Sequence, residues 1–243
     1  MRKAWYACGI LAIGLIAGCG GGTTLATTPV AAPATTPVTT QPRGTVQAGA
    51  TPTGQASGPA SIPCPAGTTM PDPSATSPAG SALLARLLPI PVGDTPDTSL
   101  AKAGVFSLTD FMNANYPAAP AEEQYFQADC FQTAVHRAWS SPNQDVTSAW
   151  LVQFGTAAGA RSYTVADEQA LSGDPTYTDD FRVPRVADGM GYGRPGSQSF
   201  TSVTDVLGDA GNVAILITFY TPENLDNAAA SLLLQQQYAL LSS

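Results

Sequence analysis

Acidic residues are absent from the N-terminal part of the chain, and between Gly20 and Pro71 the only charged residue is Arg43. All 18 acidic residues lie at Asp72 or later. This break in composition separates two regions of different character. About 160 residues follow it, enough for one domain with a substantial core. The sequence therefore predicts a nearly uncharged N-terminal region followed by one folded domain.

Runs of lysine and arginine are also absent, and the net charge is −8. Binding to nucleic-acid phosphates requires clustered positive charge, and so does electrostatic adhesion to anionic lipid. We therefore expect no nucleic-acid partner, and no attachment to a membrane through charge alone.

Only one histidine is present, His136. Ser-His-Asp triads and most zinc sites depend on histidine with suitable partners. The Gly-x-Ser-x-Gly and Cys-x-x-Cys motifs are missing as well. We predict that His136 is a surface or half-buried residue beside Arg137, and not a catalytic group. No metal and no cofactor are expected.

The N-terminus begins with Arg2 and Lys3, followed by a mostly apolar run from Trp5 to Ile16. This run is too short to span a membrane, which takes about 20 apolar residues. It suits a secretory signal, predicted over residues 1–18. The run ends in Ile16-Ala17-Gly18-Cys19.

These four residues resemble the lipobox of bacterial lipoproteins: an aliphatic residue, two small residues and a cysteine. The resemblance implies a diacylglyceryl thioether on Cys19 and cleavage just before it. It also implies a lipid-anchored protein on the extracytoplasmic face of the cell membrane. Attachment through two or more acyl chains is stable. The alternatives are an uncleaved anchor, or an ordinary signal with a chance cysteine.

Residues 19–79 form the predicted tether. They are rich in Thr, Pro, Ala, Gly and Ser, as in "TTLATTPVAAPATTPVTT". This composition cannot build a packed core, and frequent proline blocks helix and sheet. It predicts a semi-extended spacer of the kind found in surface proteins of high-GC Gram-positive bacteria.

Two of the four cysteines remain for the mature domain, Cys64 and Cys130. Cys8 leaves with the signal and Cys19 carries the lipid. An even pair in an oxidising compartment predicts a disulfide. The alternative is two free thiols.

The domain, residues 80–243, reads as a mixture of helices and strands. Helices are expected at 81–91, 107–116 and 156–171, and another is expected to start at Pro222 behind a Thr221 cap. Residues 129–139 fit either a helix, with Phe131, Val135 and Trp139 at four-residue spacing, or an alternating strand. A hairpin of strands 130–139 and 146–154 is favoured, because "SPNQD" between them is turn chemistry. Two further strands are expected to meet at residues 209–212.

The stretches "SAWLVQFGTAAGARSY" and "VAILITFYTPENLDNA" both run strand, Phe, Thr, helix. They predict two β-β-α halves and an α+β fold, with an antiparallel sheet and helices packed on one face. This arrangement resembles the extracytoplasmic domains of actinobacterial surface lipoproteins, including sensor-like folds, over residues 83–241.

Two segments are candidate sites. "GYGRPG" (191–196) matches Gly-x-Gly-x-x-Gly, but Pro195 and a following strand oppose a dinucleotide site. We interpret it as a mobile binding loop carrying Met190, Tyr192 and Arg194. "SGDPTYTDD" (172–180) groups Asp174, Asp179 and Asp180, and is read as a solvated loop, with a weak calcium site as the alternative.

The function predicted from these features is a non-catalytic domain that binds a lipid, a cell-wall fragment or an envelope protein. One alternative is an envelope hydrolase or transferase that uses carboxylates. Another is a structural or assembly protein of the envelope.

Overall fold

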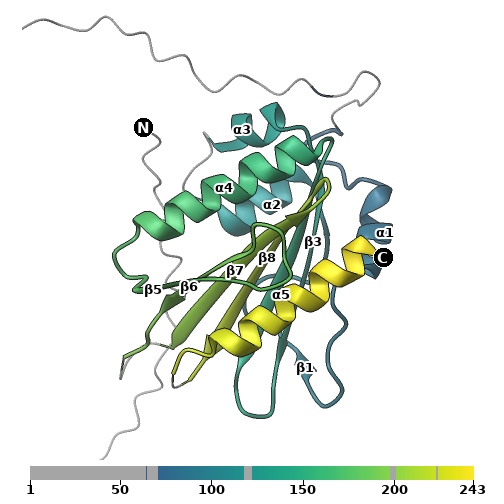
Figure 1. Cartoon of the computed structure of the whole chain (residues 1–243). Coiled ribbons are helices and arrows are strands. Elements are labelled where there is room, and N and C mark those ends of the chain that lie inside the picture. Colours follow the sequence, from purple (N-terminus) through teal and green to yellow (C-terminus); the bar gives the residue numbers. More distant parts are fainter. Residues whose placement is uncertain (1–63, 65–70, 118–121, 198–200, 223) are drawn as a thin grey trace, which may run out of the picture. The chain divides into compact units, whose positions relative to one another are not determined.

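Among the residues that the structure describes, eight strands form one antiparallel sheet and five helices pack against it (Figure 1). This computed structural model describes residues 64, 71–117, 122–197, 201–222 and 224–243. The predicted signal peptide, Cys19 and most of the tether lie outside the described residues. Pro73, within the predicted tether, accepts at its carbonyl from the amide of Thr109 (2.8 Å).

The helices and strands follow in a mixed order along the chain. The helices are α1 (Ala79–Ala85), α2 (Leu108–Asn115), α3 (Glu123–Ala128), α4 (Ala157–Gly173) and α5 (Asn227–Ser242). The strands are β1 (Thr95–Pro96), β2 (Gly104–Phe106), β3 (Phe131–Ser140), β4 (Val146–Phe154), β5 (Asp179–Arg182), β6 (Met190–Arg194), β7 (Ser202–Ala210) and β8 (Val213–Thr221).

The sheet order is β1-β3-β4-β8-β7-β6-β5, and β2 also pairs with the outer edge of β3. The predicted hairpin β3–β4 is confirmed, and so is the pair β7–β8. Each hairpin is followed by a helix, which confirms two β-β-α halves and the α+β class. The halves meet where β4 pairs with β8.

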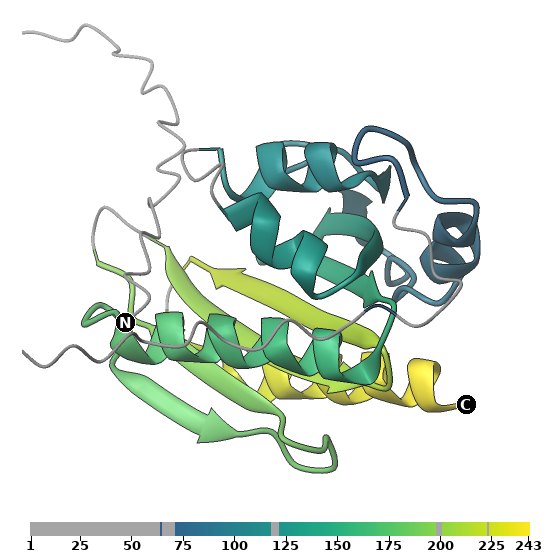
Figure 2. The same ribbon diagram turned by 90° about the horizontal axis from the view of Figure 1, so that it is seen from above.

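Helices cover both faces of the sheet, so the prediction of helices on one face is wrong (Figure 2). Leu151 and Ile215 lie in the core cluster that includes Leu234 of α5. Their neighbours Val152 and Ala214 lie in the cluster that includes Tyr163 of α4. Because successive strand residues point to opposite faces, the unbroken apolar runs of β4 and β8 require cover on both sides.

The two halves differ in which face their helix covers. Phe154 at the end of β4 lies in the α4 cluster, whereas Phe219 near the end of β8 lies in the α5 cluster. The similar sequence order therefore does not build a symmetric pair.

Helix starts follow their capping residues. The Ser107 hydroxyl accepts from the Asp110 amide (3.1 Å) at the start of α2. The predicted start of the last helix at Pro222 is wrong by several residues. Asp226 caps α5 by accepting from the Ala229 amide (2.9 Å), while the Thr221 hydroxyl donates to the carbonyl of Asn224.

Candidate binding site

One face of the sheet carries polar side chains on four neighbouring strands. The register places side by side Ser148 of β4, Thr218 of β8, Asp205 of β7 and Tyr192 of β6. We call these four residues the polar row. At about 4.8 Å between strands, the row extends roughly 14 Å across the sheet. The next row on the same face is apolar and consists of Trp150, Leu216 and Leu207.

The polar row lies on the face that α4 covers. Four positions after Asp205 on the same strand, the carboxylate of Asp209 pairs with the guanidinium of Arg161 in α4 (3.2 Å). Residues at even spacing along a strand share a face. Thr218 and Asp205 are half-buried residues, whereas Ser148 and Tyr192 at the two ends of the row are buried.

Asp205 is the centre of the polar row. Its Oδ1 accepts from the Thr218 hydroxyl (2.6 Å) and its Oδ2 accepts from the Tyr177 hydroxyl (2.5 Å). Burial raises the pKa of Asp205, while these two hydrogen bonds and the nearby Arg194 lower it. The two hydroxyls thus hold both oxygens of the Asp205 carboxyl group.

Tyr177 reaches Asp205 from the segment that follows α4. The amide of Thr178 donates to the carbonyl of Gly193 (3.0 Å), which holds this segment against β6. The guanidinium carbon of Arg194 lies 5.4 Å from the centre of the Tyr177 ring. Burial and then Asp205 raise the pKa of Tyr177, and the same two causes raise the pKa of Tyr220 to about 12. Both tyrosines are therefore neutral at physiological pH.

His136 is fully buried on β3, so the prediction of a surface or half-buried residue is wrong. Its Nδ1 lies 3.2 Å from the carbonyl oxygen of Lys102, and its Nε2 lies 3.0 Å from the hydroxyl of Ser148. The ring stacks on Trp150 with centroids 4.3 Å apart. Burial lowers the pKa of His136 to about 4. The sequence analysis missed β2, which pairs with β3 at His136 and covers it.

A histidine beside a serine resembles half of a catalytic triad, but the surroundings give it another role. The third partner is a backbone carbonyl in place of a carboxylate, and Ser148 is itself buried. Nucleophilic catalysis requires a serine that a substrate can reach. The imidazole here joins β3 to β4 and to the chain just before β2.

The predicted loop around Met190, Tyr192 and Arg194 is a strand, β6, so its description as a mobile loop is wrong. A Cβ on Gly191 would overlap the Phe181 ring, and one on Gly193 would lie 2.8 Å from Leu225. Glycines allow these two side chains to lie directly on β6, which explains "GYGRPG" by packing. Tyr192 is buried, and Arg194 is half-buried beside Tyr177.

The grouped aspartates do not converge. Asp174 accepts from the amide of Thr176 (2.9 Å) in a local turn, and Asp179 accepts from the side chain of Asn227. Asp179 and Asp180 are successive residues of β5 and point to opposite faces. Within the described ranges, no group of three or more His, Cys, Asp or Glu is placed to hold a metal ion.

The sequence analysis did not name three residues of the site, Ser148, Asp205 and Thr218. Asp205 carried a visible signal, because it is a carboxylate within a strand of otherwise mostly apolar and hydroxyl residues. Tyr177 lies within the aspartate-rich segment, whose carboxylates were the residues predicted as a candidate site.

A surface hollow of about 680 Å³ opens beside this face, between residues 100–106 and α2. Its lining includes Lys102, Phe106 and Asp110. The carbonyl of Lys102 bonds to the buried His136, and none of the four polar-row residues lines this hollow.

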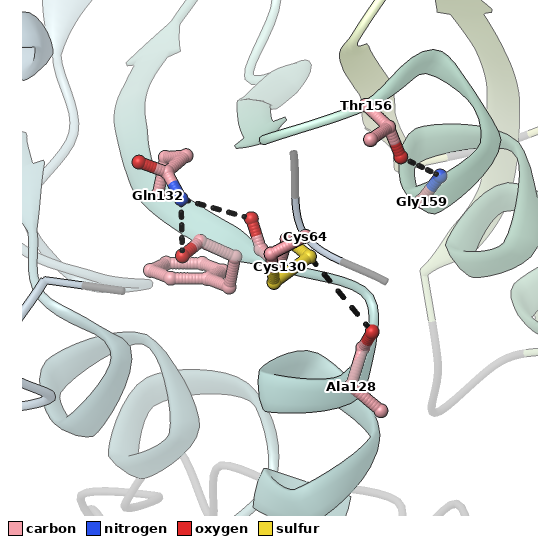
Figure 3. Close-up of a disulfide and its surroundings, with 7 residues drawn as sticks. Cys64, Ala128, Cys130, Gln132, Thr156 and Gly159 are labelled. Carbon is pink, nitrogen blue, oxygen red and sulfur yellow. Dashed lines mark hydrogen bonds between the residues drawn. A yellow bond between two sulfur atoms is a disulfide. The ribbon is translucent and has the colours of Figure 1, made fainter. Parts of the chain in front are cut away.

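The predicted disulfide is confirmed: Cys64 and Cys130 are bonded, with Cα atoms 5.6 Å apart (Figure 3). Cys130 lies between α3 and β3 and is fully buried. Its carbonyl accepts from the amide of Gly155, just before α4 (2.7 Å). The bridge therefore fastens residue 64 to the junction of both elements.

The same junction requires a glycine in the first turn of α4. Thr156 caps this helix through the amide of Gly159 (2.9 Å), and a Cβ at Gly159 would overlap the carbonyl oxygen of Asp129. Gly159→Ala is expected to lower the free energy of unfolding by about 1–2 kcal/mol, because overlap with backbone outweighs the better helix propensity. Chemical denaturation measures this change. Gly173→Ala in the same helix has open space around its Cβ and should show no loss.

No family model matches the chain, and no curated protein matches it. A solved structure that is similar is the extracellular domain of PknH from Mycobacterium tuberculosis. The two sequences are 14% identical, the match covers 69% of this chain and 98% of that one, and the TM-score is 0.47.

The helices of the described region were also compared with the length of a bilayer. None of the helices in this part of the chain is both long enough and apolar enough to span a membrane.

Proposed function

We propose that this protein is an exported lipoprotein, anchored through Cys19 on the extracytoplasmic face of the cell membrane, and that its α+β domain binds a ligand there without catalysis. The observation that carries the export is the Cys64–Cys130 disulfide. Disulfides persist in oxidising compartments and are rare in the cytosol of most organisms. The signal-like N-terminus and the lipobox-like residues 16–19 supply the route and the anchor.

Binding is favoured over catalysis by how the domain uses its ionisable groups. His136 is enclosed and held neutral between two structural partners. Asp205 accepts two hydroxyl hydrogen bonds, and the half-buried Tyr177, Arg194 and Tyr220 surround it. A fixed set of polar and aromatic groups on a rigid sheet suits ligand recognition.

Lipid attachment is tested by expressing the full chain in a bacterium with lipoprotein processing and supplying an alkyne-tagged palmitate. We expect the wild-type protein to incorporate the label and to sediment with membranes. Cys19→Ala should lose the label completely, because the thioether sulfur is gone. Cys8→Ala is the matched control, since it lies within the predicted signal and should leave labelling intact.

Two results would contradict the anchor. One is label that persists in Cys19→Ala. The other is a wild-type protein that is exported, with its disulfide formed, but remains unlabelled and in the soluble fraction.

A further inference from the structure

The hydroxyl groups around the polar row share one feature, the direction of their protons. Thr218 and Tyr177 both donate to the carboxylate of Asp205. Each hydroxyl has one proton and two lone pairs. Once the proton points inward, the oxygen can only accept a hydrogen bond from a ligand.

The hydroxyl of Ser148 also donates its proton within the protein, and the hydrogen bonds of its partner His136 show why. Nδ1 of His136 faces the carbonyl oxygen of Lys102, which has no proton to give, so Nδ1 carries the proton. Nε2 of the neutral ring is then an acceptor, and the Ser148 hydroxyl must donate to it. Ser148 is buried, so the acceptors left for a ligand are the hydroxyl oxygens of the half-buried Thr218 and Tyr177.

Charged groups of both signs lie near the polar row. Burial raises the pKa of Asp205 and the nearby Arg194 lowers it, while burial, Glu168 and Asp180 raise the pKa of Tyr192. His136, Tyr177 and Tyr220 are neutral. The whole chain has a net charge of −8, which disfavours the approach of anions.

We propose that the polar row binds an uncharged ligand rich in hydroxyl donors, which is the chemistry of a neutral carbohydrate. Sugar hydroxyls donate to the outward oxygens of Thr218 and Tyr177, and Arg194 donates to sugar oxygens. The half-buried ring of Tyr220 lies two residues from Thr218 on the same face, where it offers apolar surface to the C–H face of a sugar ring. This inference rests on the binding role proposed above.

The test uses the full chain, exported and extracted in detergent, against an array of neutral oligosaccharides that includes trehalose, cellobiose and chitotriose. Inorganic phosphate and spermidine serve as anionic and cationic probes. Calorimetry then gives the affinity of each oligosaccharide that binds. We expect saturable binding of at least one neutral oligosaccharide, with weaker or no binding of phosphate and spermidine.

Two substitutions connect the binding to the row. Thr218→Val and Tyr177→Phe each remove one outward acceptor and are expected to weaken the affinity tenfold or more. Thr218→Ser keeps the hydroxyl and should retain binding. Tyr238→Phe is the matched control, because Tyr238 packs in the core on the opposite face of the sheet. Thermal unfolding of each variant confirms that it is folded.

Three outcomes overturn the proposal: tighter binding of phosphate or spermidine, oligosaccharide binding unchanged in both Thr218→Val and Tyr177→Phe, or no saturable binding to any neutral oligosaccharide. Palmitate labelling does not involve the polar row. An exported wild-type protein without the label would overturn the anchor and leave the carbohydrate site standing. Failure of carbohydrate binding would overturn the site and leave the anchor standing.

Discussion

Cys64→Ser is expected to lower the free energy of unfolding of the domain by about 4 kcal/mol. The disulfide joins residues that are 66 positions apart, and a cross-link over so long a loop restricts the unfolded chain strongly. The native state also depends on the bridge, because Cys130 lies between α3 and β3 with its carbonyl bonded to Gly155. Phe126 and Phe131 on either side of this junction belong to the α4-side core.

Urea unfolding with and without a reducing agent measures this effect. Reduction should destabilise the wild-type protein to the level of Cys64→Ser and should leave the variant unchanged. Cys64→Ser is preferred to a change at Cys130, because Cys130 is buried and has a positive φ of 63°, so a substitution there would mix two effects. A wild-type protein that is insensitive to reductant would show that the bridge adds no stability.

The sequence predicted the central hairpins because their signals are local. "SPNQD" marks a turn between two stretches rich in β-branched and aromatic residues, and both the turn and the enrichment can be seen in the local sequence. Which face each helix covers is not a local property. It depends on whether the chain after β4 or β8 crosses to one side or the other, and on strand register, so the prediction of a single covered face was wrong.

Strands β2 and β6 show the other limit. β2 has only three residues, Gly104–Phe106, which is too few for a period to be visible. β6 reads Met-Gly-Tyr-Gly-Arg, a composition typical of a loop, and it is a strand because Phe181 and Leu225 fill the space beside its glycines. Because β2 was not predicted, His136 was expected near the surface. Because β6 was not predicted, Tyr192 and Arg194 were expected in a loop.

The polar row could not be predicted from the sequence, for a related reason. Ser148, Asp205 and Thr218 lie on three strands, and only the register brings them side by side. Tyr177 joins them from a segment whose path depends on a backbone hydrogen bond to β6. Arg194 was named as a binding residue, and it lies at this site by way of the strand that the sequence did not show.

His136 gives the second large expected effect, a loss of stability in mild acid. Its pKa is about 4 in the folded protein, against 6.5 for an ordinary histidine. Between these two pH values the unfolded chain binds a proton that the folded protein does not, so the free energy of unfolding falls as the pH falls. For a shift of this size the loss approaches about 3 kcal/mol at pH 4.

Other ionisable groups make the free energy of unfolding of the wild-type protein change with pH in the opposite direction. Burial raises the pKa of Asp205 and of Glu168, so each binds a proton more readily in the folded state than in the unfolded chain. The contribution of each group to the free energy of unfolding therefore increases as the pH falls. The contribution of His136 is therefore read from a difference between two proteins. His136→Gln keeps polar atoms near Lys102 and Ser148 but does not titrate.

Urea unfolding of both proteins at several pH values between 7 and 4 gives this difference. The wild-type protein should lose about 3 kcal/mol more than His136→Gln over the range, whatever their stabilities at pH 7. Equal slopes would mean that the imidazole gains its proton inside the fold near its ordinary pKa.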